Sequence, residues 1–301
     1  MKLYGICTVF NEAYIAKTVM KYAELLGYDR FIAYNNGSTD ETVNLISQYP
    51  FIEVRDFGTN GVFDDTKRLN LIYNTIFELR DYHRKTYGNE LAWVYIGDFD
   101  EVVFYNMADT ASSLKGYIEN MTFCGYNVCS ETIVNLLVPK DSEAELNNSL
   151  PHDIEKARIS YQTPFAWEKP TLFRLDNLND ICLTLGWHFC CFDYGNEEPK
   201  QFFNNRYVCR FHLKHLTKTG FMLHRKDLST RSYSFDGKEG DSMYDERDNE
   251  KLSNDWNGFF QKGIPVKTYM ENKLLNGNDA DEHGHQTVRF GDYIWGKVKG
   301  I

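Results

Sequence analysis

The sequence lacks the features that mark membrane proteins and nucleic-acid-binding proteins. No apolar run approaches the ~18 residues that a membrane-spanning helix needs. The 43 acidic residues outnumber the 33 basic ones and give a formal net charge of −10, which disfavours binding to a phosphate backbone or an anionic membrane surface. The apolar segment 3–10 is cut short by Asn11 and Glu12 without a secretory cleavage site, so it is interpreted as a buried strand and the chain as cytoplasmic, with no transmembrane segment.

Two further patterns are missing. The seven cysteines form no CxxC pair and no zinc-ligand spacing, so reduced thiols are expected. No GxGxxG follows the first apolar segment, which disfavours a dinucleotide-dependent oxidoreductase. What is present is a hydrophobic fraction of 42% and an aromatic fraction of 15% in 301 residues, enough to bury a substantial core and to exclude global disorder.

The first hundred residues alternate between strand-like and helix-like segments. Asn11 and the box from Ser38 to Glu41 are predicted to cap the first two helices, and Gly27 to end the first. The order predicts an α/β fold with a mostly parallel central sheet flanked by helices and a ligand crevice at the carboxyl ends of the strands. The predicted strands are 3–10, 30–34, 52–55 and 93–97.

The second half of the chain changes character. Strand-like runs at 126–134, 171–175 and 207–213 alternate with polar loops, and residues 236–286 are rich in Asp, Asn, Gly and Glu, which predicts long loops and short helices there. The sequence therefore divides into a ligand-binding half (1–105), a second half of the same domain (106–235) and a polar, loop-rich C-terminal extension (236–301).

The sharpest local feature is the acidic segment 98–101, DFDE, directly after an apolar strand. In an extended chain, residues i and i+2 face the same side, which would place the carboxylates of Asp98 and Asp100 together. Such a pair repels unless a cation or a proton lies between them, and hard oxygen ligands select Mg²⁺ or Mn²⁺. An ordinary acidic turn is the alternative interpretation.

Three segments together resemble a known family. The segments CTVFNE (7–12), YNNGSTD (34–40) and WVYIGDFDE (93–101) are similar in order and spacing to motifs of the GT-A glycosyltransferases, closest to the family 2-like branch. The likeness covers about residues 3–105. Beyond that it is thinner, resting on KPTLFR (169–174), GWH (186–188) and FHL (211–213).

The resemblance implies a nucleotide-sugar donor in the crevice, with a UDP-sugar favoured. Thr8 and Phe10 would contact the base or ribose, while Glu12 and Asn36 would hydrogen-bond to uracil or ribose. Asn36 stands where many relatives carry Asp, so the identity of the nucleotide base is not fixed by the resemblance. The diphosphate would meet a cation at a helix start, either Lys67 or Arg68. Asp98 would contact the donor as well as the metal.

The resemblance also implies the metal ligands and a base. Asp98 and Asp100 would hold Mn²⁺ or Mg²⁺, and His212 would complete the metal shell. His188 is a weaker candidate for the metal or for the acceptor hydroxyl. Asp193 would be the general base. Glu131 and Glu168 are alternative bases.

The function expected from these residues is metal-dependent transfer of a sugar from a nucleotide-diphosphate sugar to a hydroxyl of a glycan or related acceptor, as in polysaccharide biosynthesis, with inversion. One alternative is a haloacid-dehalogenase-like phosphatase with Asp98 as nucleophile, although three strand–helix units precede the motif. Another is a non-catalytic protein that binds a nucleotide sugar or a carbohydrate. No nucleic-acid partner is expected, and homo-oligomerisation is left open.

Overall fold

The computed structural model describes residues 1–105, 113–138, 157–160, 165–184, 190–202, 208–213, 216–230, 233–235, 238–240, 248–266, 268–269 and 286–289. The helices are α1 (Ala13–Leu26), α2 (Thr42–Ile46), α3 (Asp65–Tyr87), α4 (Leu114–Phe123), α6 (Lys218–Thr230) and α7 (Asn249–Lys262). Within these ranges no helix is both long enough and apolar enough to cross a membrane. His188 and residues 270–285 lie outside the described residues.

The main sheet begins with four parallel strands in the order β3-β2-β1-β5. These strands are β1 (Lys2–Val9), β2 (Arg30–Asn35), β3 (Ile52–Asp56) and β5 (Ala92–Asp98). All four predicted strands are therefore confirmed, to within one or two residues at their ends. Their carboxyl ends meet at one edge, as expected for parallel strands joined by helical crossovers.

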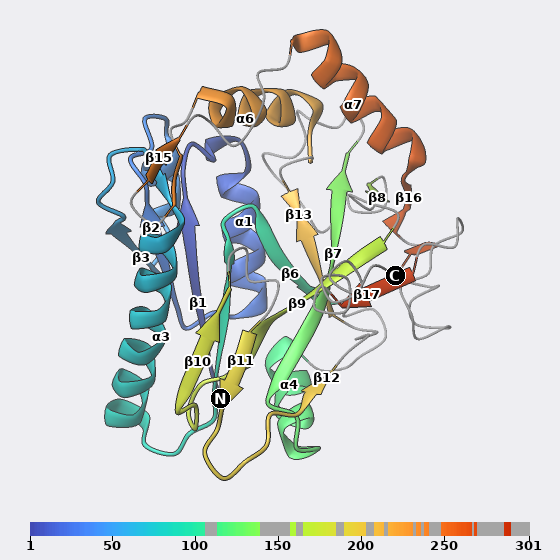
Figure 1. Ribbon diagram of the computed structural model, residues 1–301. Helices are drawn as coiled ribbons and strands as arrows, with labels where there is room; N and C mark the ends of the chain where they lie inside the picture. Colours follow the sequence, from blue (N-terminus) through green and yellow to red (C-terminus); the bar gives the residue numbers. More distant parts are fainter. Residues whose placement is uncertain are drawn as a thin grey trace.

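Beyond β5 the sheet becomes mixed and curls (Figure 1). Strand β9 pairs antiparallel with β5 and β7, β8 pairs antiparallel with β7 and β16, and β13 pairs antiparallel with β6. Three parallel pairs complete the sheet: β13 with β7, β12 with β7, and β17 with β9. These strands are β6 (Glu101–Tyr105), β7 (Val128–Leu137), β8 (Arg158–Ser160), β9 (Phe165–Arg174), β12 (Gln201–Phe202), β13 (Val208–His212), β16 (Ile264–Pro265) and β17 (Gln286–Arg289). Small sheets are formed by β10 (Asp180–Leu183) with β11 (Cys190–Asp193), and by β4 (Phe63–Asp64), β14 (Tyr233–Phe235) and β15 (Lys238–Gly240).

Helices cover both faces of the parallel strands (Figure 1). Successive side chains of β1 point to opposite faces, so Leu3 and Cys7 pack with the buried residues of α1 and α4, whereas Tyr4 and Ile6 pack with those of α3. The α/β prediction, with a mostly parallel sheet between helices, is confirmed. The predicted division at residue 105 stays a prediction. Strand β6, which ends at Tyr105, pairs with β13, so residues on both sides of this position belong to one sheet.

Two caps differ from the sequence-based expectation, since Glu41, not Ser38, precedes α2 and neither α1 nor α2 has a side-chain cap hydrogen bond at its amino end. Glu12, not Asn11, precedes α1, and Asn11 has a left-handed φ of 51°. Its side chain accepts a hydrogen bond from the Thr39 N–H (2.8 Å), while Ser38 Oγ accepts one from the Asn11 N–H (3.1 Å). Asn11 and Ser38 thus tie the loops after β1 and β2 together. Gly27 does end α1, with φ at 75°.

The polar C-terminal part contains a longer helix than expected. In α7, 14 residues long, Asp248 caps the amino end by accepting a hydrogen bond from the Lys251 N–H (2.7 Å). Leu252 and Trp256 are buried and form a third apolar cluster with Phe221 of α6. Their four-residue spacing is a helical signal in a region whose composition indicates only loops and short helices.

Candidate functional site

The candidate site lies at the carboxyl ends of the parallel strands, where β5 ends. The chain turns at Phe99 and Asp100 instead of continuing in extended form. The Phe99 N–H donates to the Thr8 carbonyl (3.2 Å), and the Leu213 N–H donates to the Asp100 carbonyl (2.6 Å). The expectation of an extended DFDE segment is therefore wrong. As a result of the turn, Asp98 and Asp100 contact different partners.

Asp98 meets the amino-terminal turn of α3. Arg68 reaches its Oδ1 at 2.8 Å and also pairs with Asp65 at 2.7 Å. The Asp98 side chain is a third exposed, whereas those of Arg68 and Asp65 are buried. Desolvation raises the pKa of Asp98, with Glu101 and Asp100 acting in the same direction and Arg68 and Lys169 opposing them. The site therefore offers a partly exposed carboxylate beside a buried guanidinium.

Asp100 meets His212 from the other side of the turn. Its Oδ2 lies 3.1 Å from His212 Nε2, and both side chains are buried. Pairing of β13 with β6 places His212 opposite Glu101, one residue after Asp100. The structure thus brings the predicted late histidine to the acidic motif, although 112 positions separate the two in sequence.

A buried ionic network stands behind the turn. Glu101 receives Lys169 Nζ (2.6 Å) and Arg210 (2.8 Å), and Arg210 also pairs with Glu131 (2.9 Å). Although burial opposes ionisation, Lys169 and Arg210 hold the pKa of Glu101 well below its usual range. Burial raises the pKa of Glu131 to about 7, against the opposing effect of Arg210. A buried charge network of this kind fixes geometry, because each unmatched charge would be costly.

Arg210 is the member of the network that the sequence analysis does not identify. It lies in the strand VCRFH with no exposed side-chain surface, and its guanidinium stacks over the Tyr95 ring at 4.9 Å from the centroid. Glu131 hydrogen-bonds to Thr171 Oγ1 (3.0 Å), which places this alternative base within the network. The sequence signal for Arg210 is a single charged residue inside an otherwise apolar strand.

The predicted nucleotide contacts differ in their availability. Thr8 is buried at the end of β1, in register with Asp98, and Phe10 is partly exposed beside Gly61. Glu12 is buried, and desolvation together with the charges of Asp100, Asp40 and Asp98 raises its pKa well above the usual range, while Tyr14 opposes this shift.

Asn36 and Lys67 instead support the loop after β3. The Asn36 amide donates to the Val62 carbonyl (2.9 Å) and accepts from Thr59 Oγ1 (2.6 Å). Lys67 Nζ donates to the Gly58 carbonyl (2.8 Å). Both side chains are therefore engaged by the loop after β3, and Arg68 is the cation that lies against Asp98.

Asp193 lies at the opposite end of the sheet. It ends β11, where its carbonyl accepts from the Asn179 N–H (2.8 Å), and the nearby Leu175 N–H binds the carbonyl of Ala92, the first residue of β5. Asp98 is the last residue of β5, about 20 Å further along the strand. The structure does not bring Asp193 to the acidic motif, so its expected role as general base is not carried further.

The donor set at the turn fits a divalent cation in part. Ligands in neighbouring positions of an octahedral site, each about 2.1 Å from the ion, are separated by about 3 Å. Asp100 Oδ2 and His212 Nε2 are 3.1 Å apart and meet this requirement. In the described part of the chain no group of three or more His, Cys, Asp or Glu side chains could hold a metal by itself. Two protein ligands suit Mg²⁺ or Mn²⁺ when substrate phosphates supply others.

Comparison with known proteins places this chain in no family. No protein-family model matches it, and no curated protein matches it significantly. Among solved structures it is similar to "Crystal structure of 4-diphosphocytidyl-2C-methyl-D-erythritol synthase", with 10% identity, a TM-score of 0.29, and 59% of this chain and 76% of that chain covered. A likeness this distant supports no functional argument. The function is therefore argued from the residues of the site.

Proposed function

We propose that the protein is a GT-A-type glycosyltransferase, similar to family 2, that takes its sugar from a nucleotide-diphosphate donor, with a UDP-sugar favoured. The supporting observation is the convergence of Asp98, Asp100 and His212 on one turn at the carboxyl ends of the parallel strands, with Arg68 beside them. In open α/β sheets this edge is where ligands bind.

Each residue has a role in this proposal. Asp100 and His212 hold Mn²⁺ or Mg²⁺, which would offset charge that develops on the leaving diphosphate. Arg68, fixed by Asp65, orients Asp98 and supplies positive charge where the diphosphate lies. Thr8 and Phe10 line the base side of the crevice. The network around Glu101 keeps the turn in place from behind.

The acceptor is proposed to be a hydroxyl of a glycan or a related molecule. Direct displacement at the sugar carbon would invert its configuration, and the acceptor proton would leave to a base or to water. The phosphatase alternative is disfavoured because three strand–helix units precede the acidic motif, which usually opens the chain in that family.

A thermal-shift screen tests the proposal. UDP-, GDP-, CMP- and dTDP-sugars are added with and without Mn²⁺ to the wild type, to Asp100→Asn and to Asp176→Asn, a control carboxylate at the other end of the sheet. We expect one nucleotide class to stabilise the wild type and the control only when metal is present, and not to stabilise Asp100→Asn. No stabilisation of the wild type by any donor would overturn the proposal.

Donor turnover tests the chemistry itself. Release of free nucleotide diphosphate is followed in the presence of Mn²⁺, and Asp98→Asn and Asp100→Asn are expected to lower its rate at least about 100-fold. Binding without any turnover across a broad acceptor panel would favour the non-catalytic alternative. Trapping of fluoroberyllate on Asp98 would favour the phosphatase.

A further inference from the structure

The hairpin β10–β11 carries two exposed cysteines in direct register. Cys182 and Cys191 are backbone partners in this antiparallel pair, and both are exposed. Side chains alternate along each strand, so Ile181 and Cys190 point inward to the core that α3 covers. Cys182 and Cys191 therefore share the outward face of the hairpin.

This arrangement meets the geometric requirement for a disulfide. Residues directly opposite each other in an antiparallel pair have Cα atoms about 4.5–5.5 Å apart. Disulfides span Cα separations of about 4.4–6.8 Å. Cys190 is the neighbour in sequence, but it is buried and opposite Leu183, so it faces away from the pair.

We propose that Cys182 and Cys191 form a reversible redox pair, which closes to an intramolecular disulfide when a small-molecule disulfide such as oxidised glutathione is present. This inference is independent of the sugar-transfer site. Cysteine pairs that are exposed on the surface of an otherwise reduced protein are the ones whose disulfides act as labile, regulatory bonds.

The chemistry proceeds in two exchange steps. The thiolate of Cys182 attacks one sulfur of oxidised glutathione, which forms a mixed disulfide and releases one glutathione thiolate. The thiolate of Cys191 then attacks the Cys182 sulfur, which closes the ring and releases the second glutathione. The two cysteines lose two electrons and two protons in total, and one oxidised glutathione becomes two reduced ones.

The order of attack follows from the surroundings of the two sulfurs. Desolvation raises the pKa of Cys191, and a negative charge on Cys182 raises it further. A smaller thiolate fraction slows the first attack by Cys191.

Ring closure would join the two strands of a hairpin whose first strand is tied to α3 at its start. The Tyr73 hydroxyl donates to Asp180 Oδ1 (2.9 Å) at the start of β10. A bond between Cys182 and Cys191 would join the two strands near their other ends. We expect slower hydrogen exchange in β10 and β11 after oxidation, and no change in α1.

Peptide mapping by mass spectrometry tests the proposal on the full chain. Protein is equilibrated with excess oxidised glutathione, and Cys124, exposed at the end of α4, serves as the reference thiol. We expect the 182–191 peptide to lose the mass of two hydrogens while Cys124 carries glutathione. Stable glutathione on Cys182 or Cys191, or free thiols there while Cys124 is modified, would overturn the proposal.

Single variants test the order of the steps. Cys191→Ser is expected to retain one glutathione on Cys182, because the resolving thiol is absent. Cys182→Ser is expected to react at Cys191 several-fold more slowly, and Cys124→Ser to close the ring at the wild-type rate. Equal rates of glutathione addition in Cys191→Ser and Cys182→Ser would contradict the assignment of Cys182 as the attacking thiol.

Discussion

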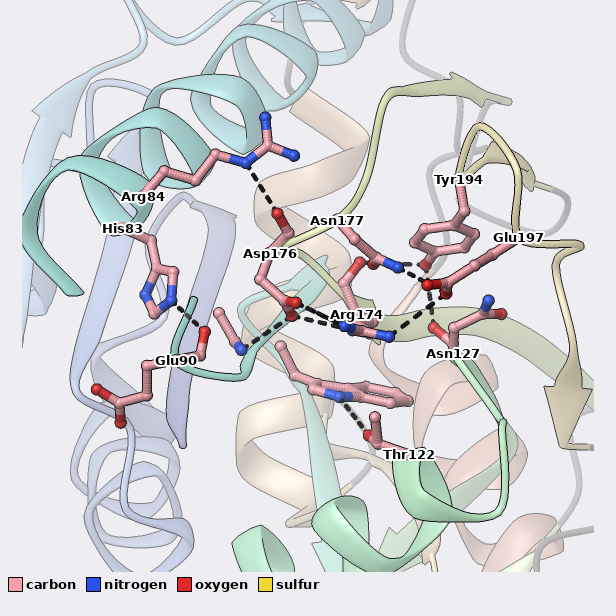
Figure 2. A network of polar contacts seen from close by, with 12 residues as sticks. His83, Arg84, Glu90, Thr122, Asn127, Arg174, Asp176, Asn177, Tyr194 and Glu197 are labelled. Atoms are coloured by element: carbon pink, nitrogen blue, oxygen red, sulfur yellow. Dashed lines mark hydrogen bonds and ion pairs between the residues drawn. The ribbon is translucent and has the colours of Figure 1, made fainter. Parts of the chain in front are cut away.

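The four parallel strands all begin at one end of the sheet, here called the amino edge, and all finish at the other end, here called the carboxyl edge. Charged side chains gather at both. At the amino edge, Arg174 lies between Asp176 and Glu197, and Arg84 of α3 reaches the Asp176 carbonyl (Figure 2). Tyr194 adds hydrogen bonds to the carbonyls of Asn127 and Arg174. Arg84 and Glu197 are exposed and Arg174 is partly exposed, whereas Tyr194 is buried.

At the carboxyl edge acids predominate, and apart from Asp98, which is a third exposed, they are buried. Glu12, Asp98, Asp100 and Glu101 lie close enough to influence one another's ionisation, and the pKa values of Glu12 and Asp98 are raised. Perturbed acids of this kind are typical of functional sites, whereas matched, partly exposed pairs are typical of structural ones. Location and solvation therefore distinguish the two edges better than the number of charges does.

Replacing the central arginine of each edge is expected to give the largest difference in the free energy of unfolding. Arg210 has no exposed side-chain surface, while the Arg174 side chain is 23% exposed. Arg210→Met would leave Glu101 and Glu131 buried with less compensation and cost about 3–5 kcal/mol. Arg174→Met would cost about 1 kcal/mol or less. Urea unfolding measures both, and equal losses would remove the distinction between the edges.

The raised pKa of Glu131 predicts a pH dependence that is specific to the carboxyl edge. From its ordinary value of 4.5 to about 7, the unfolded chain releases a proton that the folded chain retains. Stability of the wild type relative to Glu131→Gln should therefore fall as pH rises through this window, by at most about 3 kcal/mol, and then level off.

Unfolding curves of the two proteins across this pH range test the prediction, because the other titrating groups are common to both and cancel. A difference that is constant, or that grows in favour of the wild type as pH rises, would show that Glu131 is ionised throughout.

A smaller effect is expected from Asn36, which supports the loop after β3. Asn36→Ala removes two hydrogen bonds, to Val62 and Thr59, and should cost about 2 kcal/mol. Asn177→Ala at the amino edge removes an exposed bond to Glu197 and should cost about 0.5 kcal/mol. Thermal unfolding measures both. A larger loss for Asn177→Ala would mean that the loop after β3 is held by other contacts.

Local patterns predicted the elements better than the contacts between them. The strands up to Asp98 and the end of α1 at Gly27 follow from apolar runs and a glycine whose φ is positive. The prediction of an extended DFDE segment was wrong because hydrogen bonds with Thr8 and Leu213, both far away in sequence, accompany a turn at Phe99. Such pairings depend on the tertiary fold and leave no local signal.

The site was predictable in its acids and less so in their partners. Asp98 and Asp100 stand out by position, but Arg210 is hidden in an apolar strand whose register with β6 and β7 determines what it meets. Asn36 and Lys67 have residue types suited to a ligand, yet nearby loop carbonyls engage them. Polar residue types identify a candidate edge of the sheet, and the fold decides which side chains remain available there.

Isothermal titration of the UDP-sugar in the presence and absence of Mn²⁺ is the sharpest test of a metal-dependent donor site. We expect metal-dependent binding by the wild type and by Asp176→Asn, and binding at least about tenfold weaker for Asp100→Asn. Equal affinity of Asp100→Asn and Asp176→Asn, or binding that is indifferent to the metal, would contradict this expectation.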